Sequence, residues 1–530
     1  MIIRMNTRKR ISFFFLILLL ITLFFRTDYR FKNTIECCSD EYDYFMHAST
    51  IVLDFDFDYS NQELRNPYYE YEGKKSPTGF VGTGILVSPF LFIGNLLNKV
   101  LNNSYEMLFN YSMIIYSFAS IFYFLSSFRF LNKILNELDF EIDTFILLLI
   151  FSGSGLSYYA FERFGMPHVF EVFATTLTIY FSLVFFKSGK NIAALAIPIF
   201  ISIGILVKMT NYYLFVLPYL IKNLYLLKKG STHKLLLNKY FILSTIMCVS
   251  FYTRISMALY GRFVINPQLV YKTDLNFQEI ISYNNNIFEL IFDLTETLMI
   301  VLFSNEFGLF WVSPILFFGL FFCLKYFLKI GSLSSIELKI LLTLIVSFGM
   351  NFYIIHIWQT AASSYGYRYM LSLVPIAIAL LPFASKKIIK YYLIPFSLFS
   401  NLSILFFETT KQTQLSTVPE VNTFGTINRF VEPNYVTGVL QSFFDLNSYL
   451  IIFSTSLLGA LIFKFVLTVI DKDIFLTLLQ DLGLPSQNED FQILLTNLLE
   501  IKFSNFIFVL VLCIFISAYL IKLKIGTYKK

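Results

Sequence analysis

Charged residues are scarce in this chain. They form only 14% of its 530 residues, whereas about 25% is usual in a soluble domain. Hydrophobic residues form 56%, with 64 Phe and 34 Tyr among them. A water-soluble protein of this size could not bury so much apolar surface. The composition therefore excludes a soluble enzyme, a disordered scaffold and a secreted disulfide-bonded module, and it indicates a multi-pass integral membrane protein.

Cysteine and histidine are rare as well, with five and four residues. No pair of cysteines has the CxxC spacing that is typical of a metal site, so the cysteines point to no function. The net charge of +6 is modest, and no basic run is dense enough to indicate nucleic acid as a partner. The few polar residues beside the long apolar runs are therefore the informative ones.

Long apolar runs, rather than alternating segments of about ten residues, predict membrane-spanning helices and not barrel strands. The run 11–25 follows a basic N-terminus and ends at Arg26 without a small-residue cleavage site. We therefore expect an uncleaved signal anchor, with a cleaved signal peptide as the alternative. Basic clusters follow five later runs, and the positive-inside rule places these clusters and the N-terminus in the cytoplasm. This parity requires that residues 80–97, which contain glycines and a proline, form a re-entrant or interfacial helix on the outer face.

The predicted fold is an all-α integral membrane protein, a polytopic bundle of about thirteen transmembrane helices with a large first extracytoplasmic loop. The predicted spans are 11–25, 107–128, 143–160, 167–186, 191–207, 211–227, 240–257, 308–328, 338–358, 369–384, 391–407, 450–470 and 505–521. Residues 471–504 mix acidic and apolar residues and are expected to form an amphipathic cytoplasmic segment. Thirteen spans place the C-terminal lysines outside, which conflicts with the positive-inside rule.

The first outer loop carries Asp40 and Glu41 about 15 residues after the first predicted span. A carboxylate at the membrane surface can act as a general base toward a hydroxyl or amine, and two adjacent carboxylates can bind a divalent cation. A solvated acidic loop is the alternative. Arg368 lies among three tyrosines at a predicted membrane boundary, where its guanidinium fork suits a phosphate diester or pyrophosphate. An interfacial aromatic belt with a topology anchor is the alternative there.

Three further candidates lie at the outer ends of predicted spans. His168 could bind phosphate or move a proton, and a packing role is the alternative. Glu306 could hold a sugar hydroxyl or be a plain loop acid. Lys208 lies where positive charge is disfavoured, which indicates an anionic partner. A protein that only moves a solute should instead bury charges near the bilayer midplane, and few residues there are ionisable in this chain.

These stretches, in this order, resemble the GT-C superfamily of polytopic glycosyltransferases, near its protein O-mannosyltransferase and aminoarabinose transferase branch. The resemblance rests on six motifs, which are Ser39-Asp40-Glu41-x-x-Tyr44 with His47-Ala48, Ser76-Pro77-Thr78-Gly79 with the stretch from Gly84 to Phe90, Met166-Pro167-His168, Leu206-Val207-Lys208-Met209-Thr210-Asn211, Gly308-Leu309-Phe310-x-x-Ser313-Pro314 and Tyr365-Gly366-Tyr367-Arg368-Tyr369. Pro167 departs from the family, where a small polar residue is usual, and only Trp358 remains of the usual Trp-rich approach to the last motif.

The resemblance covers residues 8–410. It implies a catalytic module over residues 1–410, whose first extracytoplasmic loop, 26–106, bears juxtamembrane helices. Residues 411–530 match nothing in the family. They are expected to hold an extracytoplasmic loop, one or two further transmembrane helices and the amphipathic segment.

The resemblance also implies a glycosyltransferase that takes a monosaccharide from a polyprenyl-phosphate donor and transfers it, with inversion, to a lipid, glycan or protein acceptor. Asp40 would be the catalytic base, with Glu41 beside it. The donor phosphate would be bound by Arg368, Lys208, His168, Arg163 and Tyr365, and the sugar or acceptor by Glu306 and Asp43. One carboxylate base suffices chemically, because a phosphate is a good leaving group. The resemblance leaves a divalent cation open, because some relatives use one and others do not.

Other functions stay open as alternatives. A lipid-linked saccharide flippase or other transporter predicts repeated halves and midplane charges. An O-antigen polymerase or ligase usually carries its large loop late in the chain, whereas the acidic loop comes first here. A non-catalytic membrane scaffold is the third alternative. For the glycosyltransferase we expect a multi-pass protein of the plasma (inner) membrane, or of the endoplasmic reticulum in a eukaryote, with its site on the extracytoplasmic face.

Overall fold

The computed structural model describes residues 7–27, 30, 39–65, 68–101, 110–228, 233–265, 287–304, 308–358, 365–406, 435–484 and 489–526. The regular elements among these residues are helices, apart from one antiparallel hairpin and an isolated bridge between Arg26 and Ser456, so the all-α prediction is confirmed. In chain order the elements are α1 (Thr7–Phe24), α2 (Ser39–Ser49), η1 (Thr50–Asp54), β1 (Tyr68–Tyr71), β2 (Lys74–Pro77), α3 (Val81–Val100), α4 (Tyr111–Glu137), α5 (Thr144–Ser152), α6 (Leu156–Phe161), α7 (His168–Ser188), α8 (Asn191–Val207), η2 (Met209–Phe215), α9 (Leu217–Lys228), η3 (Leu235–Leu237), α10 (Lys239–Tyr260), α12 (Ile287–Phe303), α13 (Leu309–Val312), α14 (Pro314–Phe327), η5 (Ile330–Ser332), α15 (Ser335–Trp358), η6 (Arg368–Leu373), α16 (Val374–Ala379), η7 (Leu381–Phe383), α17 (Lys386–Ile388), η8 (Ile389–Leu393), α18 (Ile394–Leu405), α20 (Tyr435–Phe444), α21 (Leu446–Thr455), α22 (Leu457–Val469), α23 (Lys472–Asp481), α24 (Glu489–Glu500) and α25 (Phe503–Gly526).

Six helices in the described part are long and apolar enough to cross a membrane. They are α3, α4, α7, α10, α15 up to Ile355, and the stretch Lys386–Leu405 that joins α17, η8 and α18. The pair α24 and α25, bent by 93°, would make a seventh. Other predicted spans are shorter or interrupted helices, such as α5 with α6 over 143–160. The number thirteen therefore stays a prediction.

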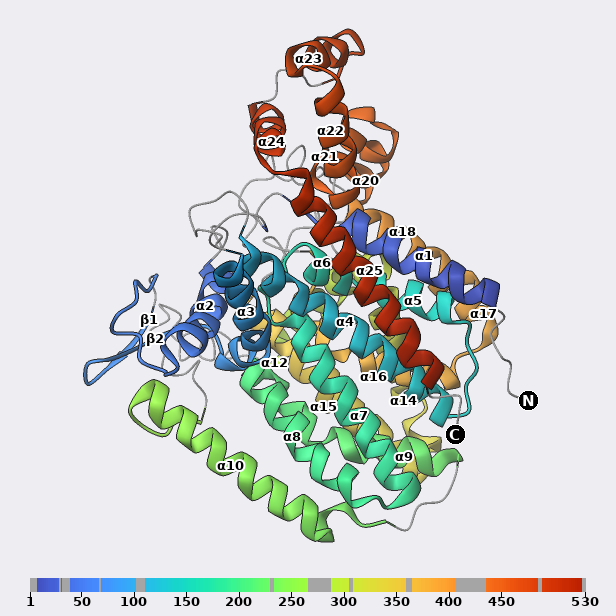
Figure 1. Cartoon of the computed structure of the whole chain (residues 1–530). Helices are drawn as coiled ribbons and strands as arrows, with labels where there is room; N and C mark the ends of the chain where they lie inside the picture. The colour runs from blue at the N-terminus through green and yellow to red at the C-terminus, as the bar shows by residue number, and fades with distance from the viewer. Residues whose placement is uncertain are drawn as a thin grey trace.

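Helices α4, α7 and α8 lie at the centre of the bundle (Figure 1). Asn110 caps the start of α4, where its side chain accepts a hydrogen bond from the backbone of Ser112. Aromatic rings fill the space between α4 and α7, with Tyr123 packed on Phe170 and Phe173. Helix α10 packs on α8 at the edge of the bundle and leaves most of its own surface open.

Helix α3 is continuous through Pro89, so the helix expected over residues 80–97 is present. Gly82 lies against the backbone of Leu206, and Gly94 lies against the backbone of Ser112, with no room for a Cβ atom at either position. These glycines therefore let α3 approach α8 and α4 closely. By length and composition α3 is also one of the six possible spans. Its placement on the outer face stays a prediction.

The predicted span 450–470 is not one helix. It divides at Ser456, whose backbone is extended and whose side chain caps α22 by accepting a hydrogen bond from the N–H of Gly459. The next residue, Leu457, donates its N–H to the carbonyl of Phe25 at 2.7 Å. The chain at the end of α1 is therefore hydrogen-bonded to the break between α21 and α22. Each of these two helices is short.

Helix α25 packs beside α1 and begins next to α4, where Asn505 accepts a hydrogen bond from the Tyr111 hydroxyl at 3.4 Å. It runs to the end of the bundle at which α1 starts (Figure 1). Residues 522 and 524 therefore lie on the side of the predicted cytoplasmic loops, which removes the conflict with the positive-inside rule. Residues 472–481 and 489–500 form the helices α23 and α24, and the cytoplasmic location of 471–504 stays a prediction.

Candidate active site

Asp40 lies in the first turn of α2 and faces Arg368 at the start of η6. Asp40 Oδ2 and Arg368 Nη2 are 3.6 Å apart, and the two side chains are 51% and 13% exposed. An ion pair this open, and longer than a direct hydrogen bond, contributes little to stability. Both groups can therefore exchange this contact for contacts with a ligand.

Glu41 points into the protein instead. Its Oε2 accepts a hydrogen bond from Arg163 Nε at 2.8 Å, and both side chains are nearly buried. Burial raises the pKa of Glu41, while the Arg163 guanidinium and the backbone N–H of Gly165 act in the opposite direction. The two residues neutralise each other out of reach of a substrate. The geometry therefore supports neither direct catalysis by Glu41 nor donor binding by Arg163.

Asp43 and His47 hold the outer-loop segment that leads into α3. Asp43 is buried and accepts a hydrogen bond from the Thr78 hydroxyl, and burial raises the pKa of Asp43 to about 6. His47 Nδ1 lies 2.5 Å from the Tyr59 hydroxyl, and His47 Nε2 lies 2.7 Å from the carbonyl of Gly79. Burial lowers the pKa of His47 to about 4, so this imidazole is neutral at pH 7. Asp43 therefore fastens the loop rather than facing a sugar or acceptor.

His168 and Lys208 meet at Glu171, on the first turn of α7. His168 Nδ1 lies 3.1 Å and Lys208 Nζ 3.6 Å from the same oxygen, Glu171 Oε1. All three side chains are nearly fully buried. Glu171 therefore supplies the anionic partner that the position of Lys208 predicted, and it does so from within the chain. His168 has a packing and orienting role in this geometry.

Tyr365 points away from Arg368. Its hydroxyl is hydrogen-bonded to Ser400 Oγ at 3.1 Å, and its carbonyl accepts a hydrogen bond from the Tyr159 hydroxyl at 2.8 Å. Gly366 follows with φ of +64°, a left-handed conformation that glycine adopts without strain, and it turns the chain between Tyr365 and Arg368. Tyr365 is fully buried and positions the turn, so direct donor binding by its side chain does not fit.

The ring of Tyr369 contacts one cation from the Asp40–Arg368 pair and one from the buried Glu171 cluster. The Lys208 ammonium lies 3.9 Å from the centre of this ring, and the Arg368 guanidinium lies 5.4 Å from it. Both contacts are within cation–π range, so Tyr369 stabilises two cations that would otherwise repel each other. Arg368 contacts the half-exposed carboxylate of Asp40, whereas Lys208 contacts the buried carboxylate of Glu171.

The donor set offers little to a divalent cation. The described residues contain no group of three or more His, Cys, Asp or Glu side chains that could hold a metal ion. Asp40 faces a guanidinium, and Glu41 is directed away from it to Arg163. We therefore assign no step of a reaction to a divalent cation. Glu306, the candidate for a sugar hydroxyl, lies outside the described residues.

Sequence reasoning missed two charged residues that support the site. Glu171 lies three residues after His168, and an acid inside an apolar run is a signal that could have revealed it. Arg26 follows α1 at the end that the sequence predicts to be extracytoplasmic, where the positive-inside rule disfavours a basic residue, as it does at Lys208. Its Nε donates a hydrogen bond to Glu162 at 2.7 Å, next to Arg163 in the chain.

No protein-family model matches the chain, and no curated protein matches it. Among solved structures, the apo oligosaccharyltransferase of Archaeoglobus fulgidus is 13% identical at a TM-score of 0.34, over 81% of this chain and 62% of that one. The oligosaccharyltransferase AglB of the same organism, in complex with an inhibitory peptide and a dolichol-phosphate, is 12% identical at 0.35, over 82% and 56%. This chain thus spans less than two thirds of either relative. Similarity at this level does not establish a shared activity.

Proposed function

We propose that this chain is a membrane-embedded glycosyltransferase that moves one sugar from a polyprenyl-phosphate donor to a hydroxyl or amine acceptor on the extracytoplasmic face. The observation that carries the proposal is the Asp40–Arg368 pair. It places a proton acceptor and an anion-binding group side by side, with the carboxylate half exposed. The other described ion pairs beside it, Glu41–Arg163 and Glu171–Lys208, are buried and already neutralised.

In the proposed reaction, the acceptor oxygen or nitrogen attacks the anomeric carbon while the bond from that carbon to the phosphate oxygen breaks. Asp40 takes the proton of the acceptor as the new bond forms. Arg368 releases Asp40 and binds the phosphate through two parallel N–H donors, which stabilises the charge on the leaving lipid phosphate. A single displacement of this kind inverts the anomeric centre.

The surroundings of the pair suit a donor that is half lipid and half sugar. Arg368 begins η6, which packs on α7, and α7 is apolar and long enough to cross a membrane. A lipid tail can therefore remain among apolar helices while its phosphate reaches Arg368. The acceptor would approach from the solvent side of Asp40, where the carboxylate is open.

Incubation of the purified protein with a panel of labelled polyprenyl-phosphate sugars tests this proposal. We expect one donor to release its polyprenyl phosphate and to transfer its sugar. Asp40→Asn should abolish most of that release, whereas Asp56→Asn, an exposed aspartate of the same outer loop, should not change it. Release from no donor, or equal release by both variants, would contradict the proposal.

A further inference from the structure

The turn Phe161–Gly165, between α6 and α7, is held from two sides. On one side Arg163 donates to Glu41, and the backbone N–H of Gly165 interacts with the same carboxylate. Gly165 also packs on the Glu41 side chain, where an added Cβ would lie 3.1 Å from Glu41 Cβ. Because Glu41 follows Asp40 on α2, the position of this turn sets the position of Asp40.

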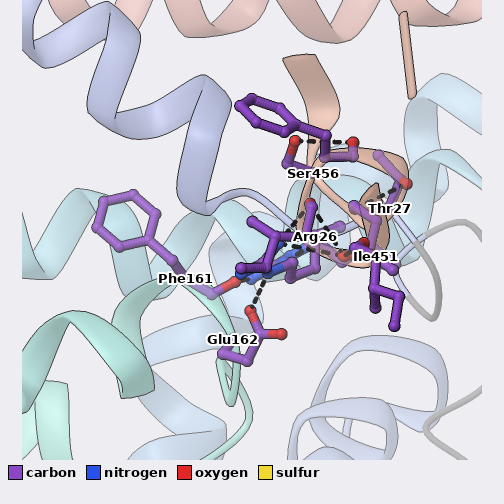
Figure 2. A network of polar contacts seen from close by, with 10 residues as sticks. Arg26, Thr27, Phe161, Glu162, Ile451 and Ser456 are labelled. Carbon is purple, nitrogen blue, oxygen red and sulfur yellow. Dashed lines mark hydrogen bonds and ion pairs between the residues drawn. The ribbon is translucent and has the colours of Figure 1, made fainter. Parts of the chain in front are cut away.

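On its other side the turn is held by Arg26, which Figure 2 shows beside Glu162, and by Arg30. Arg26 Nε donates to Glu162 Oε2 at 2.7 Å. Arg30 donates to the carbonyl of Phe161, and its guanidinium lies 4.8 Å from the ring centre of Phe164. Its Nη1 also donates to the carbonyl of Arg26 at 3.0 Å, which links the two arginines.

Arg26 also reaches the C-terminal helices. Its Nη1 donates to the carbonyl of Ile452 at 3.0 Å and to the Thr455 hydroxyl at 3.1 Å. The backbone N–H of Thr27 donates to the carbonyl of Thr455 at 2.8 Å (Figure 2). One buried guanidinium therefore contacts α21 and the turn at the same time, through different nitrogens.

A single guanidinium that serves three acceptors on two elements fixes their relative position, because its donors are held in one plane. Arg26 is hydrogen-bonded to both Thr455 and Glu162. Glu162 is followed in the chain by Arg163, which is hydrogen-bonded to Glu41, so the contacts form a continuous path from Thr455 to Glu41. The buried parts of this path have little freedom to relax, because the Arg26 and Glu41 side chains are 5% and 4% exposed.

We propose that Arg26 is a positioning residue that couples the C-terminal helices α21 and α22 to the place of Asp40. Residues 435–469 thereby become part of the machinery that aligns the catalytic base, although they lie far from it in the chain. This inference rests on the proposed function for its kinetic consequence. Its structural consequence, the place of Asp40, does not depend on which reaction the protein performs.

The kinetic test compares two conservative changes with a matched control. Arg26→Lys keeps the charge but cannot serve three acceptors, and Glu162→Gln keeps the shape but loses the charge. Each should lower kcat about 10- to 100-fold, the range for a misplacement near 1 Å, and should leave the donor KM nearly unchanged. Arg254→Lys, an exposed arginine of α10, should alter neither constant.

Thr455→Val isolates the C-terminal link, because it removes one hydroxyl and leaves the Arg26–Glu162 pair intact. Coupling predicts a lower kcat for this variant as well, with an unchanged melting temperature. Wild-type kcat in folded Arg26→Lys, Glu162→Gln and Thr455→Val would overturn the proposal. A fall in melting temperature with unchanged kcat per folded molecule would show that these residues have a structural role alone. This result would also overturn the proposal.

A second readout is independent of sugar transfer. Asp40→Cys, in a chain whose Cys37 and Cys38 are replaced by serine, reports the place of residue 40 through its rate of alkylation by a charged thiol reagent. Arg26→Lys should change this rate, and Arg254→Lys should not. A changed rate without transfer from any donor would refute the proposed function and uphold the positioning role. Transfer with an unchanged rate would refute the positioning role alone.

Discussion

Two acid–base groups flank the ring of Tyr369, and they differ in their access to solvent. On the surface, Asp40 and Arg368 face each other across 3.6 Å with the carboxylate half exposed. Beneath it, Glu171 holds Lys208 and His168 with almost no exposure. Residues of the same chemical types therefore lie near one ring, with Lys208 3.9 Å and Arg368 5.4 Å from its centre.

The contrast shows why residue type and order alone did not distinguish residues that can bind a ligand from residues that only hold the structure around them. The half-exposed carboxylate of Asp40 is partly hydrated, so its attraction to Arg368 is weakened and a ligand can displace it. A buried pair has lost its hydration and depends on its partner, so breaking it is costly. We therefore assign the chemical reaction to Asp40 and Arg368, and a structural role to the buried group around Glu171.

The largest effect on stability should come from Glu171→Ala. This change leaves Lys208 buried without its carboxylate, and removal of one partner from a buried ion pair costs about 3–5 kcal/mol. Glu137→Ala, which breaks the exposed pair with Lys187, is the matched control and should cost about 0–1 kcal/mol. Thermal unfolding in one detergent measures both. Equal effects would remove the distinction between buried and exposed pairs.

A second contrast lies within α2, between exposed Asp40 and buried Asp43. The folded protein holds the proton of Asp43 more tightly than the unfolded chain does, because its pKa is raised to about 6. The contribution of Asp43 to the free energy of unfolding is therefore fully present at low pH. It falls by about 3 kcal/mol at most as the pH rises from about 4 to about 6. Asp43→Asn should flatten this part of the curve of melting temperature against pH.

Asp56→Asn, at an exposed position of the same loop, is the control for that pH dependence, because the charge of Asp40 itself helps to raise the pKa of Asp43. Glu41, whose pKa is also raised, adds a loss of the same sign to every variant, so the difference between the two asparagine variants isolates Asp43. An identical pH dependence in Asp43→Asn and the unaltered protein would show that Asp43 is not protonated through burial.

A smaller effect is expected at Arg368, on donor binding rather than on stability. Arg368→Ala should weaken donor binding about tenfold, and Arg368→Lys less, because lysine keeps the charge but loses the fork. Arg65→Ala, which removes an exposed arginine stacked on Tyr42, should not alter binding. Binding of a labelled donor by equilibrium dialysis distinguishes the three. Unaltered binding in Arg368→Ala would return this residue to the role of a topology anchor.

Hydropathy predicted long uninterrupted helices well, and it failed where tertiary contacts decide the backbone. The predicted range 191–207 coincides with α8, which continues through Pro198. The range 450–470 divides at Ser456 because the end of α1 pairs with it, and no local pattern records that contact.

The candidate site shows the same limit. The sequence motifs identified both Asp40 and Arg368 as candidate site residues. They could not show that Arg163 neutralises Glu41 and that Glu171 neutralises Lys208. Side-chain direction decided these roles. A residue next to Asp40 on a helix points to a different face, so adjacency in sequence was a poor guide to shared chemistry.

The central claim is that Asp40 acts on the acceptor while its neighbour Glu41 only holds the turn. The most direct measurement is transfer activity together with donor affinity for Asp40→Asn and Glu41→Gln in the same membrane preparation. We predict a loss of about 10²–10⁴-fold in transfer for Asp40→Asn with nearly unchanged donor affinity, and a smaller loss for Glu41→Gln, whose amide oxygen still accepts from Arg163. Near-normal transfer by Asp40→Asn, with Glu41→Gln inactive, would contradict the account.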